Sequence, residues 1–122
     1  MSKLEKSNQL IVAIIDALEN IKGEDIRILD LRDIENAVCK YFIICSGGSN
    51  TQVNALSRSV QKQVSKSIRE KPLQIEGTET AEWVLLDYID IVVHIFQKSV
   101  REYYDIESLW GDAKLTEIAS NY

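Results

Sequence analysis

The stretch EWVLLDYIDIVVHIFQ, from Glu82 to Gln97, decides the fold because it predicts a β-hairpin. Two apolar runs, Trp83–Tyr88 and Ile91–Gln97, flank Ile89-Asp90, which we take as a two-residue turn. In this register one face of the hairpin is entirely apolar or aromatic and must pack against helices; its members are Val84, Leu86, Tyr88, Ile91, Val93 and Ile95. Ile89 fits the positive φ of a type I′ turn poorly, since that turn favours glycine or asparagine.

The opposite face of the hairpin carries the chemistry-bearing side chains. It pairs Trp83 with Phe96, Leu85 with His94, and Asp87 with Val92. Three interpretations compete: His94 is a general base oriented by Asp87, His94 is a half-buried structural residue, or the face contacts a macromolecule through its aromatic residues. The sequence shows no nucleophile or substrate-binding residue at a spacing from His94 that would indicate a catalytic site, which counts against catalysis.

The rest of the chain is predicted to form three helices and three further strands around this hairpin. Apolar spacing predicts a helix over Leu4–Lys22, ended by Gly23 in a left-handed conformation. Strands are predicted at Ile26–Leu31 and, as a central strand, Tyr41–Cys45, with a weak edge strand over 73–77. A second helix follows a cap at Ser49 or Asn50, and a third starts at the capping box Ser99–Glu102 and ends at Gly111.

The resulting order is α-β-β-α-β-β-β-α. It predicts an α+β (mixed α/β) fold, in which helices pack on a small mixed β-sheet. The length of 122 residues suits a single domain, 1–122, with 111–122 as a loosely held tail.

Composition narrows the function classes. No apolar run is long enough to span a membrane, and no signal peptide is recognisable, so we expect a cytoplasmic protein. Cys39 and Cys45 lack metal-ligand spacing and read as small core residues of a reducing compartment. The net charge is +2 over residues 1–71 and −7 over 72–122, which favours either a basic partner or simple solubility.

Two further features of the sequence are compatible with a binding function. Arg58, Lys62, Lys66 and Arg69 form a basic stripe on the second predicted helix, suited either to solvent or to RNA phosphate. The turn Ser46–Asn50 (SGGSN) joins a strand to that helix and either binds an anion or serves as a tight turn and cap. The turn matches no established nucleotide motif, and the two hairpin aspartates are poorly placed to hold Mg²⁺.

Three segments together resemble the ribosomal silencing factor family (RsfS, also called Iojap). They are YFIICSGGSN, EWVLLDYIDIVVHIFQ and VREYYDIESLWGD, and the resemblance runs from the first helix to Trp110. The chain departs from the family pattern at Ile89, where glycine is usual, and at Gly48, where threonine is frequent.

The resemblance implies a translational repressor that is not an enzyme and needs no cofactor or metal. Members bind protein fourteen of the large ribosomal subunit and block joining of the small subunit, on a nucleotidyltransferase-like fold without catalytic acids. We expect contacts from Trp83, Tyr88, Leu85, His94 and Phe96. We also expect the basic stripe to touch nearby rRNA.

Alternatives stay open at this point. Tyr104 and Trp110 match the family pattern and are either core or contact residues. The leading rival function is a nucleotidyltransferase-like enzyme or nucleotide sensor using Ser46–Asn50. Exposed apolar patches would also allow a homodimer when the protein is free.

Overall fold

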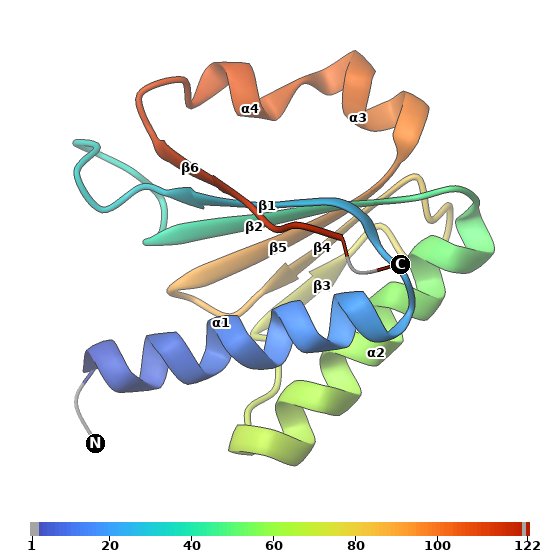
Figure 1. Cartoon of the computed structure of the whole chain (residues 1–122), viewed down its shortest axis with the longest axis horizontal. Helices are drawn as coiled ribbons and strands as arrows, with labels where there is room; N and C mark the ends of the chain where they lie inside the picture. Colours follow the sequence, from blue (N-terminus) through green and yellow to red (C-terminus); the bar gives the residue numbers. More distant parts are fainter. Residues whose placement is uncertain (1–2, 121) are drawn as a thin grey trace.

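The structure, a computed structural model, describes residues 3–120 and 122. Figure 1 shows a β-sheet with helices on both of its faces. The helices are α1 (Lys3–Asn20), α2 (Asn50–Ile68), α3 (Lys98–Tyr104) and α4 (Ile106–Leu109). The strands are β1 (Glu24–Asp30), β2 (Tyr41–Gly47), β3 (Gln74–Glu76), β4 (Trp83–Asp87), β5 (Ile91–Gln97) and β6 (Lys114–Glu117). The predicted α+β class, with a small mixed sheet, is confirmed.

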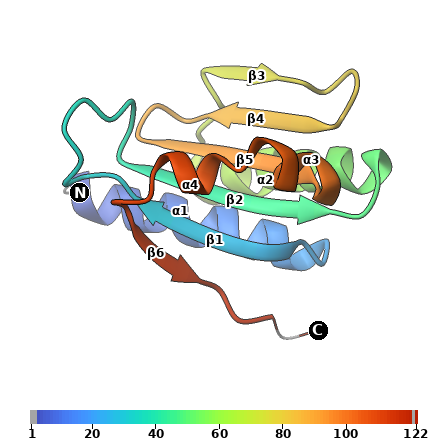
Figure 2. The same cartoon turned by 90° about the horizontal axis from the view of Figure 1, so that it is seen from above.

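The sheet has the strand order β3-β4-β5-β2-β1-β6, which Figure 2 shows from above. β2 and β5 run parallel, and the other neighbouring pairs are antiparallel. β2 lies inside the sheet and is buried along its whole length, as its unbroken apolar sequence predicted. β3 is an exposed edge strand, which is also as predicted.

The predicted hairpin register is confirmed, from Trp83 opposite Phe96 to Asp87 opposite Val92. Ile89 and Asp90 form the turn as predicted, but Ile89 adopts the positive φ that its side chain disfavours. Ile89 has a φ of 75°, and the Asp90 backbone N–H donates to the Tyr88 carbonyl at 3.0 Å, which closes a γ-turn centred on Ile89. The Ile89 N–H donates to Asp87 Oδ1 at 2.7 Å. The aspartate side chain thus holds the backbone in a conformation that a β-branched residue disfavours.

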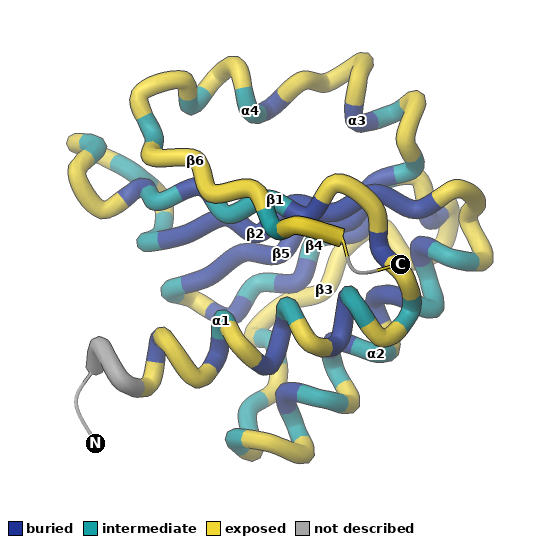
Figure 3. Tube along the Cα trace, viewed as in Figure 1, coloured by how far each residue is buried: buried dark blue, intermediate teal, exposed yellow. Residues whose placement is uncertain are grey.

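Each face of the hairpin belongs to a separate core. The apolar face, including Val84, Leu86 and Ile95, packs with buried residues of α1 and α2. The opposite face packs beneath α3 and α4, where Phe96 and Ile106 are both buried. Figure 3 shows the buried residues concentrated along the central strands and at spaced points on the helices. The prediction that the apolar face packs on helices is therefore confirmed.

The C-terminal part of the chain corrects three expectations. Ser99 does not cap a helix, because α3 already begins at Lys98 after Gln97, which makes no side-chain cap bond. The predicted single helix is broken at Asp105, whose φ of 45° separates α3 from α4. The predicted loose tail contains β6, which pairs with β1 from Arg27–Glu117 to Asp30–Lys114.

The end of α1 corrects another detail. The left-handed residue is Lys22, with a φ of 59°, and not Gly23. Gly23 is required for packing instead, since a Cβ there would lie 2.4 Å from Cys45 Sγ. Cys45 is buried, Cys39 is partly buried, and both thiols are free. Within the described residues, no helix combines the length and apolar character needed to cross a bilayer.

Candidate partner-binding surface

An aromatic cluster occupies the sheet face beneath α3 and α4. Trp83 stacks on Phe96 with ring centroids 4.8 Å apart, and Tyr104 of α3 lies 5.0 Å from Trp83 on its other side. Trp83 Nε1 donates to His94 Nδ1 at 3.0 Å. The Phe42 ring meets His94 edge-on at 4.6 Å and Trp110 edge-on at 5.7 Å. The cluster therefore joins the hairpin to the C-terminal helices.

His94 is a buried, neutral member of this cluster. Its residue is 5 % exposed, and burial lowers the pKa of the imidazole to about 4. Nδ1 accepts the Trp83 bond, so the ring proton sits on Nε2, which has no hydrogen-bond partner among the described residues. Asp87 instead holds the turn at Ile89. The hypothesised pairing of His94 with Asp87 is absent from this geometry.

Three of the five predicted contact residues lie beneath the surface. Phe96 is fully buried, and α3 and α4 cover the face that it shares with His94. Tyr88 is 6 % exposed and belongs to the same buried cluster as Leu10 of α1. Burial leaves Tyr88, His94 and Phe96 little surface of their own for a partner, and their contact with a partner stays a prediction. Trp83 and Leu85 stay partly exposed.

A hollow of about 380 Å³ is lined in part by Leu85, and we call it the lateral hollow. Its exposed members are Val38, Leu73 and Ile89, at 74, 72 and 64 % exposure. Its other lining residues are Leu85, Asp87, Val92, Phe42 and His94. Apolar side chains on three separate loops thus converge on one surface that no described residue covers.

The hollow is assembled by backbone bonds between distant segments. Lys40 and Tyr41 donate their N–H groups to the Asp90 carbonyl at 2.9 and 3.1 Å, which ties the β1–β2 loop to the β4–β5 turn. The Leu73 N–H donates to the Asp87 carbonyl at 2.7 Å and holds the third segment in place. In Figure 2 the loop and the turn lie at the same end of the sheet.

Sequence reasoning missed Val38, Leu73 and Ile89 as surface residues. Val38 stands in an otherwise polar connection, Leu73 follows the proline that ends the helical region, and Ile89 sits in the hairpin turn. A large apolar residue in a turn or polar loop is the signal that would have found them, because such segments run over the surface.

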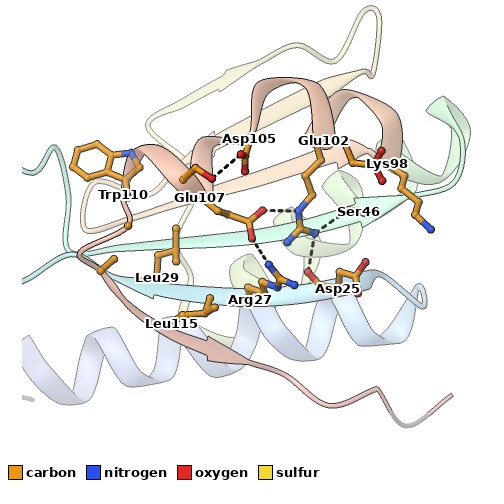
Figure 4. Close-up of a pocket in the computed structure, with 14 residues that line it drawn as sticks. Asp25, Arg27, Leu29, Ser46, Lys98, Glu102, Asp105, Glu107, Trp110 and Leu115 are labelled. Atoms are coloured by element: carbon orange, nitrogen blue, oxygen red, sulfur yellow. Dashed lines mark hydrogen bonds and ion pairs between the residues drawn. The ribbon is translucent and has the colours of Figure 1, made fainter.

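A second hollow, of about 520 Å³, lies between the sheet and the α3–α4 segment. Figure 4 shows this hollow, with Arg27 and Ser46 on the sheet side and Glu107 on the helix side. Arg101 Nη1 donates to the Asp25 carbonyl and to Ser46 Oγ, both at 2.8 Å, and Nε donates to Glu107 Oε1 at 2.8 Å. Arg27 Nη1 donates to Glu107 Oε2 at 2.6 Å. The bonds link β1, β2, α3 and α4, so this cluster fastens the C-terminal helices to the sheet.

The two arginines determine the charge state of Glu107. Burial acts to raise the pKa of this carboxyl, but the hydrogen bonds and positive charges of Arg101 and Arg27 outweigh it and hold the pKa below its usual value. Glu107 therefore stays ionised at neutral pH. Arg101 Nη2 is buried without a hydrogen-bond partner among the described residues.

The Ser46–Asn50 turn is built as a helix cap. Ser49 Oγ accepts the Gln52 N–H at 3.1 Å, which confirms the predicted cap, and Gln52 Oε1 accepts the Gly48 N–H at 2.7 Å. Ser46 Oγ is taken by Arg101. Two backbone donors of the turn and the first helical turn, those of Gly48 and Gln52, are thus engaged within the chain. Among the described residues no three His, Cys, Asp or Glu side chains are grouped to hold a metal ion.

Comparison with known proteins identifies the family. A family model described as "Ribosomal silencing factor during starvation" matches residues 4–121. The chain belongs to the ribosomal silencing factor family. It is 43 % identical to "Ribosomal silencing factor RsfS" of Bacillus subtilis over 84 % of this chain and 85 % of the relative. A crystal structure of a Chromobacterium violaceum protein superposes with a TM-score of 0.80 at 38 % identity, covering 99 % of this chain and 97 % of that one.

A more distant relative carries a mitochondrial name. The chain is 27 % identical to the mouse protein named "Mitochondrial assembly of ribosomal large subunit protein 1", over 88 % of this chain and 49 % of the mouse protein. The resemblance drawn from the hairpin and its flanking segments is therefore confirmed.

Proposed function

We propose that this protein binds the large ribosomal subunit of a bacterial-type cytosol and prevents the small subunit from joining it. Family membership supports the ribosomal role, and the name of the mouse relative points to the large subunit. Within that subunit we propose ribosomal protein fourteen as the partner, as the family resemblance implies.

The lateral hollow is the proposed contact surface. Convergent exposed apolar side chains are a feature of protein-interaction sites. Trp83, a residue type frequent among binding hot spots, is partly exposed and bonds to His94, which lines the hollow. Asp87 lines the hollow, and Asp90 lies on the adjoining turn with a side chain 47 % exposed. Apolar contact bordered by acids suits the basic surface of a ribosomal protein.

The proposed mechanism is steric and needs no chemistry on a substrate. A protein of 13.9 kDa seated on the subunit interface occupies space that the incoming small subunit must fill. The acidic half of the chain, residues 72–122, also repels rRNA phosphate on the approaching particle. Both effects oppose joining for as long as the protein stays bound.

The observation that carries the contact assignment is the exposure of Leu73, and a matched pair of variants tests it. Leu73 is 72 % exposed in the hollow, and Leu109 is 77 % exposed on α4. Neither side chain contributes much to the core, so Leu73→Asp and Leu109→Asp should both fold. We expect light scattering of purified subunits to show slower joining with wild type and with Leu109→Asp, and at least ten-fold weaker inhibition with Leu73→Asp.

The results separate the two parts of the proposal. If wild type never slows joining, the function is wrong. If Leu73→Asp inhibits as well as Leu109→Asp does, the assignment of the hollow is wrong while the function stands. Trp83→Ala is a less clean variant, because it also removes the packing on Phe96 and the bond to His94.

A further inference from the structure

The outer face of α2 carries a line of cations that form no ion pairs with the described side chains of this acidic protein. Arg58, Lys62, Lys66 and Arg69 are all exposed, and none forms an ion pair among the side chains that the structure describes. Six other cations do form ion pairs; they are Lys6, Arg27, Arg32, Lys40, Arg101 and Lys114. α2 itself contains no Asp or Glu. We call these four residues the basic ridge.

Helix geometry places the ridge directly away from the core. The four cations fall within an arc of roughly 80° at 3.6 residues per turn, nearly opposite the buried stripe of Val53, Leu56, Val60 and Val64. From Arg58 to Arg69 the ridge is about 16 Å long. A straight row of this length matches an extended polyanion better than a single small anion.

We propose that the basic ridge binds RNA phosphates of the large ribosomal subunit beside the site where the protein docks. This inference rests on the proposed function. Sequence-independent contacts from Lys and Arg to the phosphate backbone are the general mode by which proteins hold nucleic acid in place. Asn54, Gln61 and Ser65 lie near the ridge on α2 and add hydrogen-bonding groups of the kind that also contact phosphate.

The surroundings of the ridge disfavour a membrane or an acidic protein as its partner. A membrane-binding helix inserts its apolar face, but the apolar face of α2 is already buried against the sheet. A protein interface is organised around a buried apolar core, whereas the neighbours of the ridge on this face are small or polar.

The ridge continues toward the proposed docking surface. α2 ends at Ile68 and is capped by Arg69, and four residues after this cap Leu73 lines the lateral hollow. Lys71 and Leu73 also line a common hollow with Tyr88 and Ile89. In the proposed pose the apolar surface meets a ribosomal protein, and the ridge meets RNA that lies around the edge of the sheet marked by Leu73 and Ile89.

The test measures how binding to purified large subunits depends on salt. The variant Lys62→Gln/Lys66→Gln removes two ridge charges while keeping side chains of similar helix propensity. The control Lys22→Gln/Lys98→Gln removes two exposed charges away from the ridge that likewise form no ion pair among the described side chains. We expect the ridge variant to lower the slope of log K against log salt by about 1.4–1.8, and to bind roughly ten-fold more weakly at low salt. The control should match wild type.

A photo-crosslinking amino acid at position 62 identifies what the ridge touches. An RNase-sensitive adduct on bound large subunits supports the proposal, and an adduct with protein alone overturns it in favour of an acidic protein partner. Equal salt slopes for the ridge variant and its control also overturn it, while leaving the proposed function intact. If wild type fails to bind large subunits at all, the proposed function falls and this inference falls with it.

Discussion

The buried imidazole of His94 should make the stability of the protein depend on pH. Its pKa is lowered to about 4 in the folded state by burial, against about 6.5 in the unfolded chain. Because the unfolded chain binds a proton on His94 more readily than the folded protein does, lowering the pH favours unfolding. The contribution of His94 to the free energy of unfolding is fully present above pH 6.5 and is lost as pH falls toward 4. We expect the free energy of unfolding to drop by about 2 kcal/mol between pH 7 and pH 5, measured by urea denaturation.

The control for this prediction is His94→Gln, which keeps an acceptor within reach of Trp83 but does not titrate. Its free energy of unfolding should change little between pH 7 and pH 5. Asp30 and Glu107 also have lowered pKa values, but carboxyls of this kind lose their contribution below that window. An equal pH dependence in wild type and variant would show that His94 is not the responsible group.

Alternation of apolar residues was enough to predict which residues oppose each other in the hairpin, because a slip of one residue would bury the wrong face. It was not enough to predict exposure. His94 and Phe96 sit on the face that also holds Asp87, yet α3 and α4 cover them. Nothing within the hairpin sequence shows that cover, since it depends on how the chain continues after residue 97. Tyr88 was already assigned to the apolar face, and its burial follows from that assignment.

At the scale of elements, the Arg101–Glu107–Arg27 cluster should determine whether α3 and α4 stay on the sheet. Glu107→Ala leaves Arg101 buried without its carboxylate partner, and we expect a loss of about 2–3 kcal/mol in the free energy of unfolding. The matched control is Glu102→Ala on the exposed side of α3, which should change stability by less than about 0.5 kcal/mol. Chemical denaturation followed by tryptophan fluorescence measures both, and equal losses would contradict the assigned role of the cluster.

The same elements show where sequence patterns stop being informative. α3 and α4 are one continuous pattern in sequence, and the break at Asp105 comes from a left-handed residue that no glycine announces. β6 is a short strand, KLTE, whose side chains are all exposed, so it has no apolar alternation to reveal it. Its place is fixed by backbone pairing with β1, a contact between segments more than eighty residues apart.

For the whole molecule, the candidate surface became visible only when three loops were brought together. The basic ridge was evident from the sequence, because its residues share one helix and helical periodicity places them. The lateral hollow was not, because Val38, Leu73 and Ile89 belong to different loops whose meeting depends on the parallel pairing of β2 with β5. The aromatic residues singled out in the sequence support this surface from below more than they form it.

A steric mechanism makes a quantitative prediction about occupancy. If the protein acts only by filling space, inhibition of subunit joining should saturate at about one protein per large subunit. For wild type, Leu73→Asp and Lys62→Gln/Lys66→Gln, the concentration giving half-maximal inhibition should rise by the same factor as the dissociation constant. Complete inhibition should still be reached once each variant is saturating, because a bound variant occupies the same volume.

Parallel binding and light-scattering titrations on one subunit preparation measure the dissociation constant and the concentration giving half-maximal inhibition. Inhibition by protein well below the concentration of subunits, or a variant that binds fully without inhibiting, would contradict a purely steric block and indicate a catalytic or conformational step.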